Sequence, residues 1–538
     1  MFAVLTDAPI VGGVRDSETK VWFRTNQQAT VAVEYSTSPT LENASLSSIH
    51  TTQSTADHTG IITLTGLLAE TKYYYRLVVD GAPQQFSNYP SWTSFAAPGR
   101  FRDFTFAVTA DLENGTKHPV QAAPVYAQIA ADDPHFFLQI GDFDHRRPDS
   151  LAEMRSMHRS VRGPLIASGA DFAEHIADEF PVFHVWDDHD YGMNNGDKNF
   201  PGRAAALEAF KEYFPTPNLP NPSQGIWHSF GYAQADFFML DLRSQRDPFT
   251  DPEGPAKSIL DGNNIANGQK AWLKAGLLNS TANWKFVATP VPFNPTTQKK
   301  EGWAEYDTER QEILDFINAN HIEGVILISG DIHHGGGIDD GTNSGLPEVS
   351  VPHTNMTDDH TNTTRSPGLW SEGILTGVGN PGYVLFRVSQ YEVKIEIKSE
   401  SGLVRMSYDI GEIPGGGSSW FRESSDGEAS QMRDSAAAAH DTAFALLSDY
   451  AHFNSEPADE FLKSTAGRVS NPTTDSSSTQ SRTTSEGAPA PAISSRSLTS
   501  GRIGRRTLAD DVVEETVNLE AITAATKSKK VHRVGART

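Results

Sequence analysis

The chain has 538 residues, of which 37% are hydrophobic, and it carries a formal net charge of −24. This acidity argues against non-specific binding to nucleic acids or to anionic membranes. The absence of cysteine excludes disulfides, thiolate metal ligands and cysteine nucleophiles. No apolar run approaches the ~20 residues of a membrane-spanning helix. No signal peptide is visible either, so the compartment stays open and the cytoplasm is one possibility.

Residues 1–98 predict an N-terminal β-sandwich. Turn residues separate four short β-rich runs, at 21–25, 30–36, 60–67 and 71–81. Their spacing is typical of a sandwich of about seven strands. The stretch LTGLLAETKYYYRLVVDG resembles the part of a fibronectin type III domain in which a strand tyrosine forms a corner. A sandwich of this kind says little about function by itself.

Residues 99–412 alternate helical patterns with continuous apolar strands, which indicates an α/β layered fold. We expect strands at 104–111, 135–145, 180–186, 235–242, 284–291 and 324–331. We expect helices at 120–131, 151–162, 203–214, 269–280 and 308–320. The apolar–polar alternation within 378–398 favours antiparallel edge strands.

The composition changes again after residue 412. A helical extension is expected at 413–463, because 434–453 reads as one amphipathic helix. Residues 464–538 are rich in Ser, Thr, Gly and Pro at their start and are expected to be disordered. The last residues are basic, and their role is open; attachment to a polymer or a partner is one hypothesis.

Four of the expected strands end in potential metal ligands, within VTADLENG, LQIGDFDH, HVWDDHD and LISGDIHHG. One acidic strand end is usually no more than a polar turn, but four are hard to attribute to chance. Ligand sites in α/β sheets gather at the carboxyl ends of strands. Carboxylates suit hard metal ions, and imidazole extends the choice to Fe, Zn and Mn. The pattern therefore predicts a metal site at this edge.

The succession D-x-E, G-D-x-x-H, D-H-D and G-D-x-H resembles the motifs of the calcineurin-like metallophosphoesterase superfamily. Over 1–412 the chain is more specifically similar to the PhoD-like alkaline phosphatase family, through VWDDHDYG, FFMLDLRSQR, LISGDIHHG and GNPGYVLFRV. The resemblance implies a four-layer α/β/β/α sandwich behind the fibronectin III-like domain. It also implies metal-dependent hydrolysis of a phosphoric ester, in which a metal-bound hydroxide at a dinuclear site attacks phosphorus and a histidine serves as general acid.

The resemblance further implies roles for individual residues. Six residues match metal-ligand positions, with Asp142 as the bridge: Asp111, Asp142, His145, Asp188, Asp331 and His333. His189 matches the outer histidine that donates a hydrogen bond to the substrate or protonates the leaving group. Asp187 and Asp190 are expected to orient these neighbours as second-shell residues.

For several polar residues near the motifs, the sequence allows either a role in the site or a purely structural one. Arg243 could bind the substrate phosphate or pair with Asp241, and His334 could contact the substrate or face solvent. Glu113 is either a ligand or a loop acid. We also expect that His184 belongs to the core and that Glu348 orients a ligand. Residues 353–364 are expected to form a lid or an ordinary loop.

The chain departs from the family at the metal positions. His145 stands where tyrosine or aspartate is usual, and Asp331 replaces the first histidine of G-H-x-H. Thr289 and Pro290 occupy the place of a separate histidine. Two or more metal ions are expected: one of the Fe, Mn or Zn type, and one or more of the Ca, Mg or Mn type, since the second metal would see mostly oxygen.

The expected partner is a phosphate ester, either a small molecule or a polymer. The family hydrolyses monoesters and diesters, so a phosphodiesterase or phospholipase D-type activity is an alternative. A catalytically degenerate binding protein is another. The family is commonly secreted or periplasmic, whereas the sequence fixes neither the compartment nor the oligomeric state.

Overall fold

The computed structural model describes residues 2–86, 88–112, 123–162, 172–261, 268–297, 301–355, 369–376 and 380–411. All of them belong to one unit, Met1–Leu447. The helical extension expected at 413–463 and the disorder expected at 464–538 lie outside the described residues. Among the helices of the described ranges, none is long and apolar enough to cross a membrane.

The N-terminal part consists of two antiparallel sheets whose apolar side chains belong to one buried cluster. The first sheet joins β1 (Ile10–Gly12), β2 (Glu18–Arg24) and β6 (Thr59–Thr65). The second joins β4 (Ser45–Leu46), β3 (Thr30–Ser36), β7 (Lys72–Val79) and β8 (Ala82–Pro83), with β5 (His50–Thr51) beside β3 and β9 (Ser91–Thr93) beside β7. In β7, KYYYRLVV, every second side chain is buried, as a half-buried strand requires.

The tyrosine expected at the corner of this part makes a specific contact. The hydroxyl of Tyr73 accepts a hydrogen bond of 2.9 Å from the backbone N–H of Leu68, five residues upstream. A contact of this kind fixes the connection that leads into the strand. The fibronectin III-like identity of the sandwich itself stays a prediction.

Two larger sheets follow. The first contains β12 (Val182–Val185), β11 (Phe136–Ile140), β10 (Phe104–Thr109), β20 (Gly382–Val388), β21 (Glu392–Ser399) and β22 (Val404–Gly411), in this spatial order. The second contains β13 (His228–Tyr232), β14 (Ala235–Met239), β15 (Trp284–Thr289), β16 (Val325–Ser329), β18 (Glu348–Ser350), β17 (Gly337–Asp339) and β19 (Gly373–Ile374). Strands β10 to β12 run parallel, whereas β20 to β22 are antiparallel. The alternation within 378–398 predicted this antiparallel pairing, but its expected edge position is wrong, because β20 and β21 lie inside the sheet and β22 forms the edge.

The two sheets pack face to face through aromatic rings. The ring of Phe106 on β10 stacks 4.4 Å from Phe386 of its own sheet. Its edge meets Phe237 and Phe286 of the other sheet, each at 5.1 Å between ring centroids. Aromatic and apolar side chains on both inner faces remove a large area from water, which is the main force holding the sheets together.

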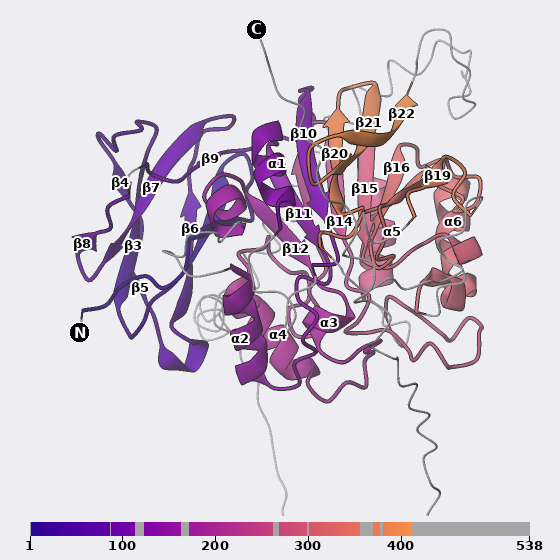
Figure 1. Ribbon diagram of the computed structural model, residues 1–538, viewed down its shortest axis with the longest axis horizontal. Helices are drawn as coiled ribbons and strands as arrows, with labels where there is room; N and C mark the ends of the chain where they lie inside the picture. The colour runs from indigo at the N-terminus through magenta and orange to yellow at the C-terminus, as the bar shows by residue number, and fades with distance from the viewer. Residues whose placement is uncertain are drawn as a thin grey trace, which may run out of the picture. The chain divides into compact units, whose positions relative to one another are not determined.

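Helices cover the outer faces (Figure 1). Helix α1 (Val125–Asp132) packs on the first sheet, where Tyr126 meets Phe137 at 6.2 Å. Helices α5 (Gln269–Asn279) and α6 (Asp307–Ala319) share an apolar cluster with the second sheet. The layers therefore run helix, sheet, sheet, helix.

The remaining elements are η1 (Ser54–Ala56), α2 (Leu151–Arg162), η2 (Ala173–Ala177), α3 (Asp188–Tyr191), α4 (Arg203–Tyr213), η3 (Pro295–Thr297) and η4 (Trp303–Tyr306).

Helices α2 and α4 join the N-terminal sheets to the larger ones. The indole Nε1 of Trp22, on β2, donates a 2.8 Å hydrogen bond to the carbonyl oxygen of Glu212 on α4. The guanidinium of Arg162 lies 4.3 Å from the Trp22 ring centre and is 1% exposed. Aromatic faces thus stabilise a buried cation at this joint.

We expect Trp22→Ala to lower the free energy of unfolding by about 3–5 kcal/mol, as large-to-small changes of buried aromatic residues do. The variant removes both the packing and the ring under Arg162. Urea unfolding followed by fluorescence and circular dichroism measures the change. Tyr391→Ala is a matched control, because Tyr391 is 68% exposed. A loss of less than about 1 kcal/mol in Trp22→Ala would contradict the importance of this joint.

Candidate metal centre

Three strands of the larger sheets each end two residues before an aspartate with left-handed backbone. Asp111 follows β10, Asp142 follows β11 and Asp331 follows β16, with φ angles of 54°, 50° and 57°. Residues other than glycine seldom adopt this conformation, although aspartate tolerates it better than most. Backbone strain of this kind clusters at ligand sites, where it directs side chains.

A glycine lets the ends of the two sheets approach each other. A Cβ atom on Gly330, next to Asp331, would lie 3.1 Å from the Cβ of Ala110 and 3.4 Å from the carbonyl oxygen of Ile140. Any larger side chain would push β16 away from β10 and β11. The glycine of SGDIHH therefore allows aspartates from two different sheets to share one site.

Asp142 is common to three groups of possible metal ligands. In each group, one ligand atom of every member lies within 4.8 Å of the others. The groups are Asp111, Asp142, Asp331 and His333; Asp142, Asp187 and Asp188; and Asp142, His145 and His189. Asp142 is therefore the residue through which the three groups are connected.

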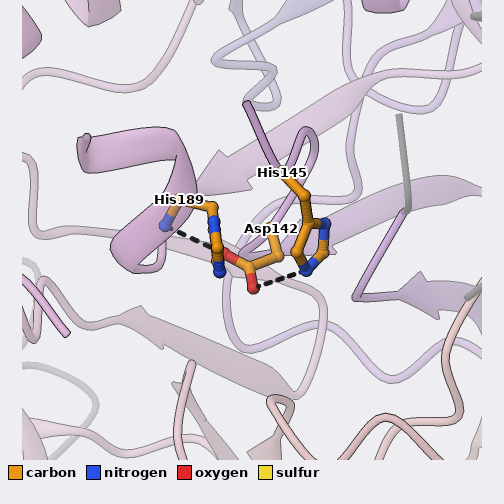
Figure 2. A group of neighbouring side chains, drawn as sticks. All are labelled: Asp142, His145 and His189. Atoms are coloured by element: carbon orange, nitrogen blue, oxygen red, sulfur yellow. Dashed lines mark hydrogen bonds and ion pairs between the residues drawn. The ribbon is translucent and has the colours of Figure 1, made fainter. Parts of the chain in front are cut away.

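Figure 2 shows the carboxylate of Asp142 between the rings of His145 and His189. Nε2 of His145 lies 3.2 Å from Oδ2 of Asp142, and the backbone N–H of His189 donates to Oδ1 at 3.2 Å. Burial alone would lower the pKa of His145, but the adjacent Asp142 raises it to about 10. Burial would likewise raise the pKa of Asp142, whereas His145 and His189 lower it below its usual value.

The segment DDHD forms the one-turn helix α3 and its cap. Asp187 caps this helix, and its side chain and that of Asp190 form a reciprocal capping box. Asp190 also accepts a 2.8 Å hydrogen bond from the backbone N–H of Phe143, in the loop after β11. Asp188 accepts a bond of 2.6 Å from the backbone N–H of Asn195. These bonds tie α3 to the Asp142 loop.

Arg243 is the cation that lies behind this cluster. It is 0% exposed, and its Nε donates a 2.6 Å hydrogen bond to Oδ1 of Asp187. That Arg243 also binds the substrate phosphate stays a prediction. Its side-chain partner is Asp187 rather than Asp241, which accepts a bond from its backbone N–H.

The donor set fits metal ions. Oδ2 of Asp187 is buried and accepts no hydrogen bond from any residue that the structure describes. A buried carboxylate oxygen without a donor is costly, and a cation would offset this cost. Burial raises the pKa of Asp187 well above its usual value, although Arg243 opposes this effect.

The structure brings all six expected ligands into the three groups. Asp187, expected only to orient its neighbours, also contributes an oxygen to one group, whereas Asp190 makes the orienting bonds. His334 is 4% exposed and belongs to none of these groups. Glu113 and positions 356–364 of the expected lid lie outside the described residues.

Two further expectations concern residues around the site. His184 lies in the core, stacked 4.1 Å from Phe214, and burial lowers its pKa well below the usual value. Glu348 accepts hydrogen bonds from the hydroxyl of Ser329 at 2.7 Å and from the backbone N–H of Phe293 at 2.9 Å. It therefore holds the end of β16 two residues before Asp331, and burial raises its pKa to about 7.

Sequence reasoning missed two residues beside the centre. Arg147 donates from Nε to Nδ1 of His189 at 3.3 Å. His353 is buried and pairs through its backbone with Ala110, next to Asp111. His353 could have been identified from its position after the carboxyl end of β18, which is a parallel neighbour of β16. No comparable signal marks Arg147.

Two sequence families match the chain. Residues 113–340 match the PhoD-like phosphatase family, and residues 3–93 match a domain of unknown function, DUF7800. The alkaline phosphatase D of Bacillus subtilis (strain 168) is 28% identical over 212 residues. This alignment covers 34% of the chain and 35% of that protein, so the chain spans about a third of the length of this relative.

Two solved structures share the fold. The structure of PhoD superposes with a TM-score of 0.61 at 19% identity, over 75% of this chain and 90% of that one. The purple acid phosphatase PPD1 from seeds of yellow lupin (Lupinus luteus) gives 0.56 at 14% identity, over 76% and 74%. Residues 113–340 are therefore similar to the PhoD-like phosphatase family, and the fold resembles that of PhoD.

Proposed function

We propose that the chain hydrolyses phosphoric esters at a site that holds at least two metal ions. The observation that carries this proposal is the position of Asp142, which is shared by three groups of buried ligand atoms. The match of residues 113–340 to the PhoD-like phosphatase family supports the choice of a phosphoric ester as substrate.

The two sides of Asp142 suit different ions. Asp187 and Asp188 offer only oxygen, which favours Ca, Mg or Mn. On the other side, His333 adds an imidazole to Asp111 and Asp331, which admits Fe, Mn or Zn. Bound ions would polarise the phosphoryl oxygens and activate a water for attack on phosphorus.

The chain's own residues orient the reaction. Asp142, fixed by the backbone N–H of His189, holds the two sides of the site in register. Arg243 compensates the charge of Asp187 through an ion pair of 2.6 Å. His189 serves as general acid or hydrogen-bond donor to the departing oxygen, from a position with its ring 4.4 Å from that of His145.

Activity assays with two esters test the proposal. The full chain, loaded in turn with Ca, Mn or Fe, is assayed with p-nitrophenyl phosphate and with bis-p-nitrophenyl phosphate. We expect hydrolysis of at least one ester, and the ratio of the two rates separates a monoesterase from a phosphodiesterase. Turnover of neither ester, with no metal found by elemental analysis, would overturn the proposal and favour a degenerate binding protein.

Asp142→Asn should lose bound metal and activity together. The amide removes the shared charge, so we expect a decrease of kcat by at least about 100-fold, with a matching loss of metal. Inductively coupled plasma analysis and the ester assay are run on the same sample. Asp103→Asn is the control, since Asp103 is an exposed acid outside the site. Full metal content and activity in Asp142→Asn would contradict its bridging position.

His189→Ala should keep its metal and lose rate. The contribution of a positioned proton or hydrogen-bond donor is commonly about 100-fold or more, and we expect kcat to fall by about that factor. Metal content is measured alongside, since His189 shares a ligand group with Asp142 and His145. A fully active variant would show that His189 has no catalytic role. Loss of metal would show that it is a ligand.

A further inference from the structure

Arg147 contacts His189 from the edge of the site. It is exposed, on the loop that connects β11 to α2. Its Nε–H donates to Nδ1 of His189 at 3.3 Å. A guanidinium has donors and no acceptor, so Nδ1 is the acceptor in this bond. A ring whose Nδ1 accepts carries its proton on Nε2.

The loop holds Arg147 in a strained conformation. Its φ angle is 56°, and Pro148 follows it, which restricts its backbone further. The carbonyl oxygen of Pro148 lies 2.6 Å from the place that a Cβ atom on Gly192 would occupy. Gly192 ends α3, three residues after His189, so this close approach fixes the loop against the helix that carries the histidine.

The neighbouring Arg146 makes different contacts. Nε of Arg146 donates to Oδ1 of Asp144 at 2.9 Å, and its guanidinium also donates to the carbonyl oxygen of Met157 on α2 at 3.0 Å. Arg146 therefore anchors the loop to α2. Of these two arginines, Arg147 is the one that is directed at His189.

The opposite side of the His189 ring faces the ligand cluster. Nε2 lies 3.9 Å from Oδ1 of Asp188, and the ring centre lies 4.4 Å from that of His145. Nε2 is therefore directed toward the cluster of expected metal ligands. With the proton on Nδ1 instead, Nε2 could only accept a hydrogen bond and would repel a negatively charged oxygen.

We propose that Arg147 is a positioning residue for the proposed hydrolysis. It fixes the His189 ring through Nδ1, so that Nε2 can donate a hydrogen bond to the leaving oxygen. This inference rests on the proposed function.

Variants of Arg147 test the role through kinetics. Arg147→Met removes the donor at similar length, and we expect kcat to fall by about tenfold with little change in KM, as for other residues that orient a histidine. Arg147→Lys keeps a donor and should recover most of this loss. In the His189→Ala background, Arg147→Met should have no further effect. Arg405→Met is the control, because Arg405 is exposed on β22.

Nitrogen NMR of the full chain labelled with ¹⁵N-histidine gives a second measurement, independent of activity. The signals of His189, assigned by their loss in His189→Ala, should show a proton on Nε2 in the wild type and a mixture of tautomers in Arg147→Met. A proton on Nδ1 in the wild type would overturn the inference. The inference would also be overturned if the wild type were active and Arg147→Met had the same kcat. A wild type that hydrolyses neither ester would overturn the proposed function, and the catalytic role of Arg147 with it.

Discussion

Repulsion among buried carboxylates is the constraint that shapes this molecule. Five aspartates that come from both large sheets lie together with little exposure: Asp111, Asp142, Asp187, Asp188 and Asp331. Two like charges about 4 Å apart repel by about 4 kcal/mol at the effective dielectric constant of a protein surface. Arg243 forms an ion pair with Asp187 and so compensates one of these five negative charges. The remaining charge explains why the site is suited to metal cations and why such ions should also stabilise the fold.

The apolar scaffold makes this concentration of charge possible. Aromatic packing between the sheets, centred on Phe106, fixes the strands whose ends carry the aspartates. Gly330 brings those ends close, and left-handed backbone directs the carboxylates into the common site. Hydrogen bonds that Asp190 and Glu348 accept then hold the α3 segment and the end of β16. Stability supplied by the core thus offsets the strain and repulsion at the site.

The sequence predicted the parts of the site that depend on local pattern. Strand ends and their acids are visible because continuous apolar runs and the residues that follow them are adjacent in the chain. The partner of Arg243 was not predictable, since Asp187 is 56 residues away and the choice depends on how two loops meet. Arg147 reaches His189 only through a left-handed turn before a proline, which no periodicity reports. The sequence likewise did not predict that Asp187 offers an oxygen to the cluster, because this depends on the direction of its side chain.

The central claim is that Asp142 joins two metal ions. Crystals of the full chain grown with manganese, examined by anomalous diffraction, test it most directly. We expect two anomalous peaks about 3.5–4 Å apart, with Asp142 bound to both and His333 bound to only one of them. A single peak, or two peaks of which Asp142 binds neither or only one, would contradict it.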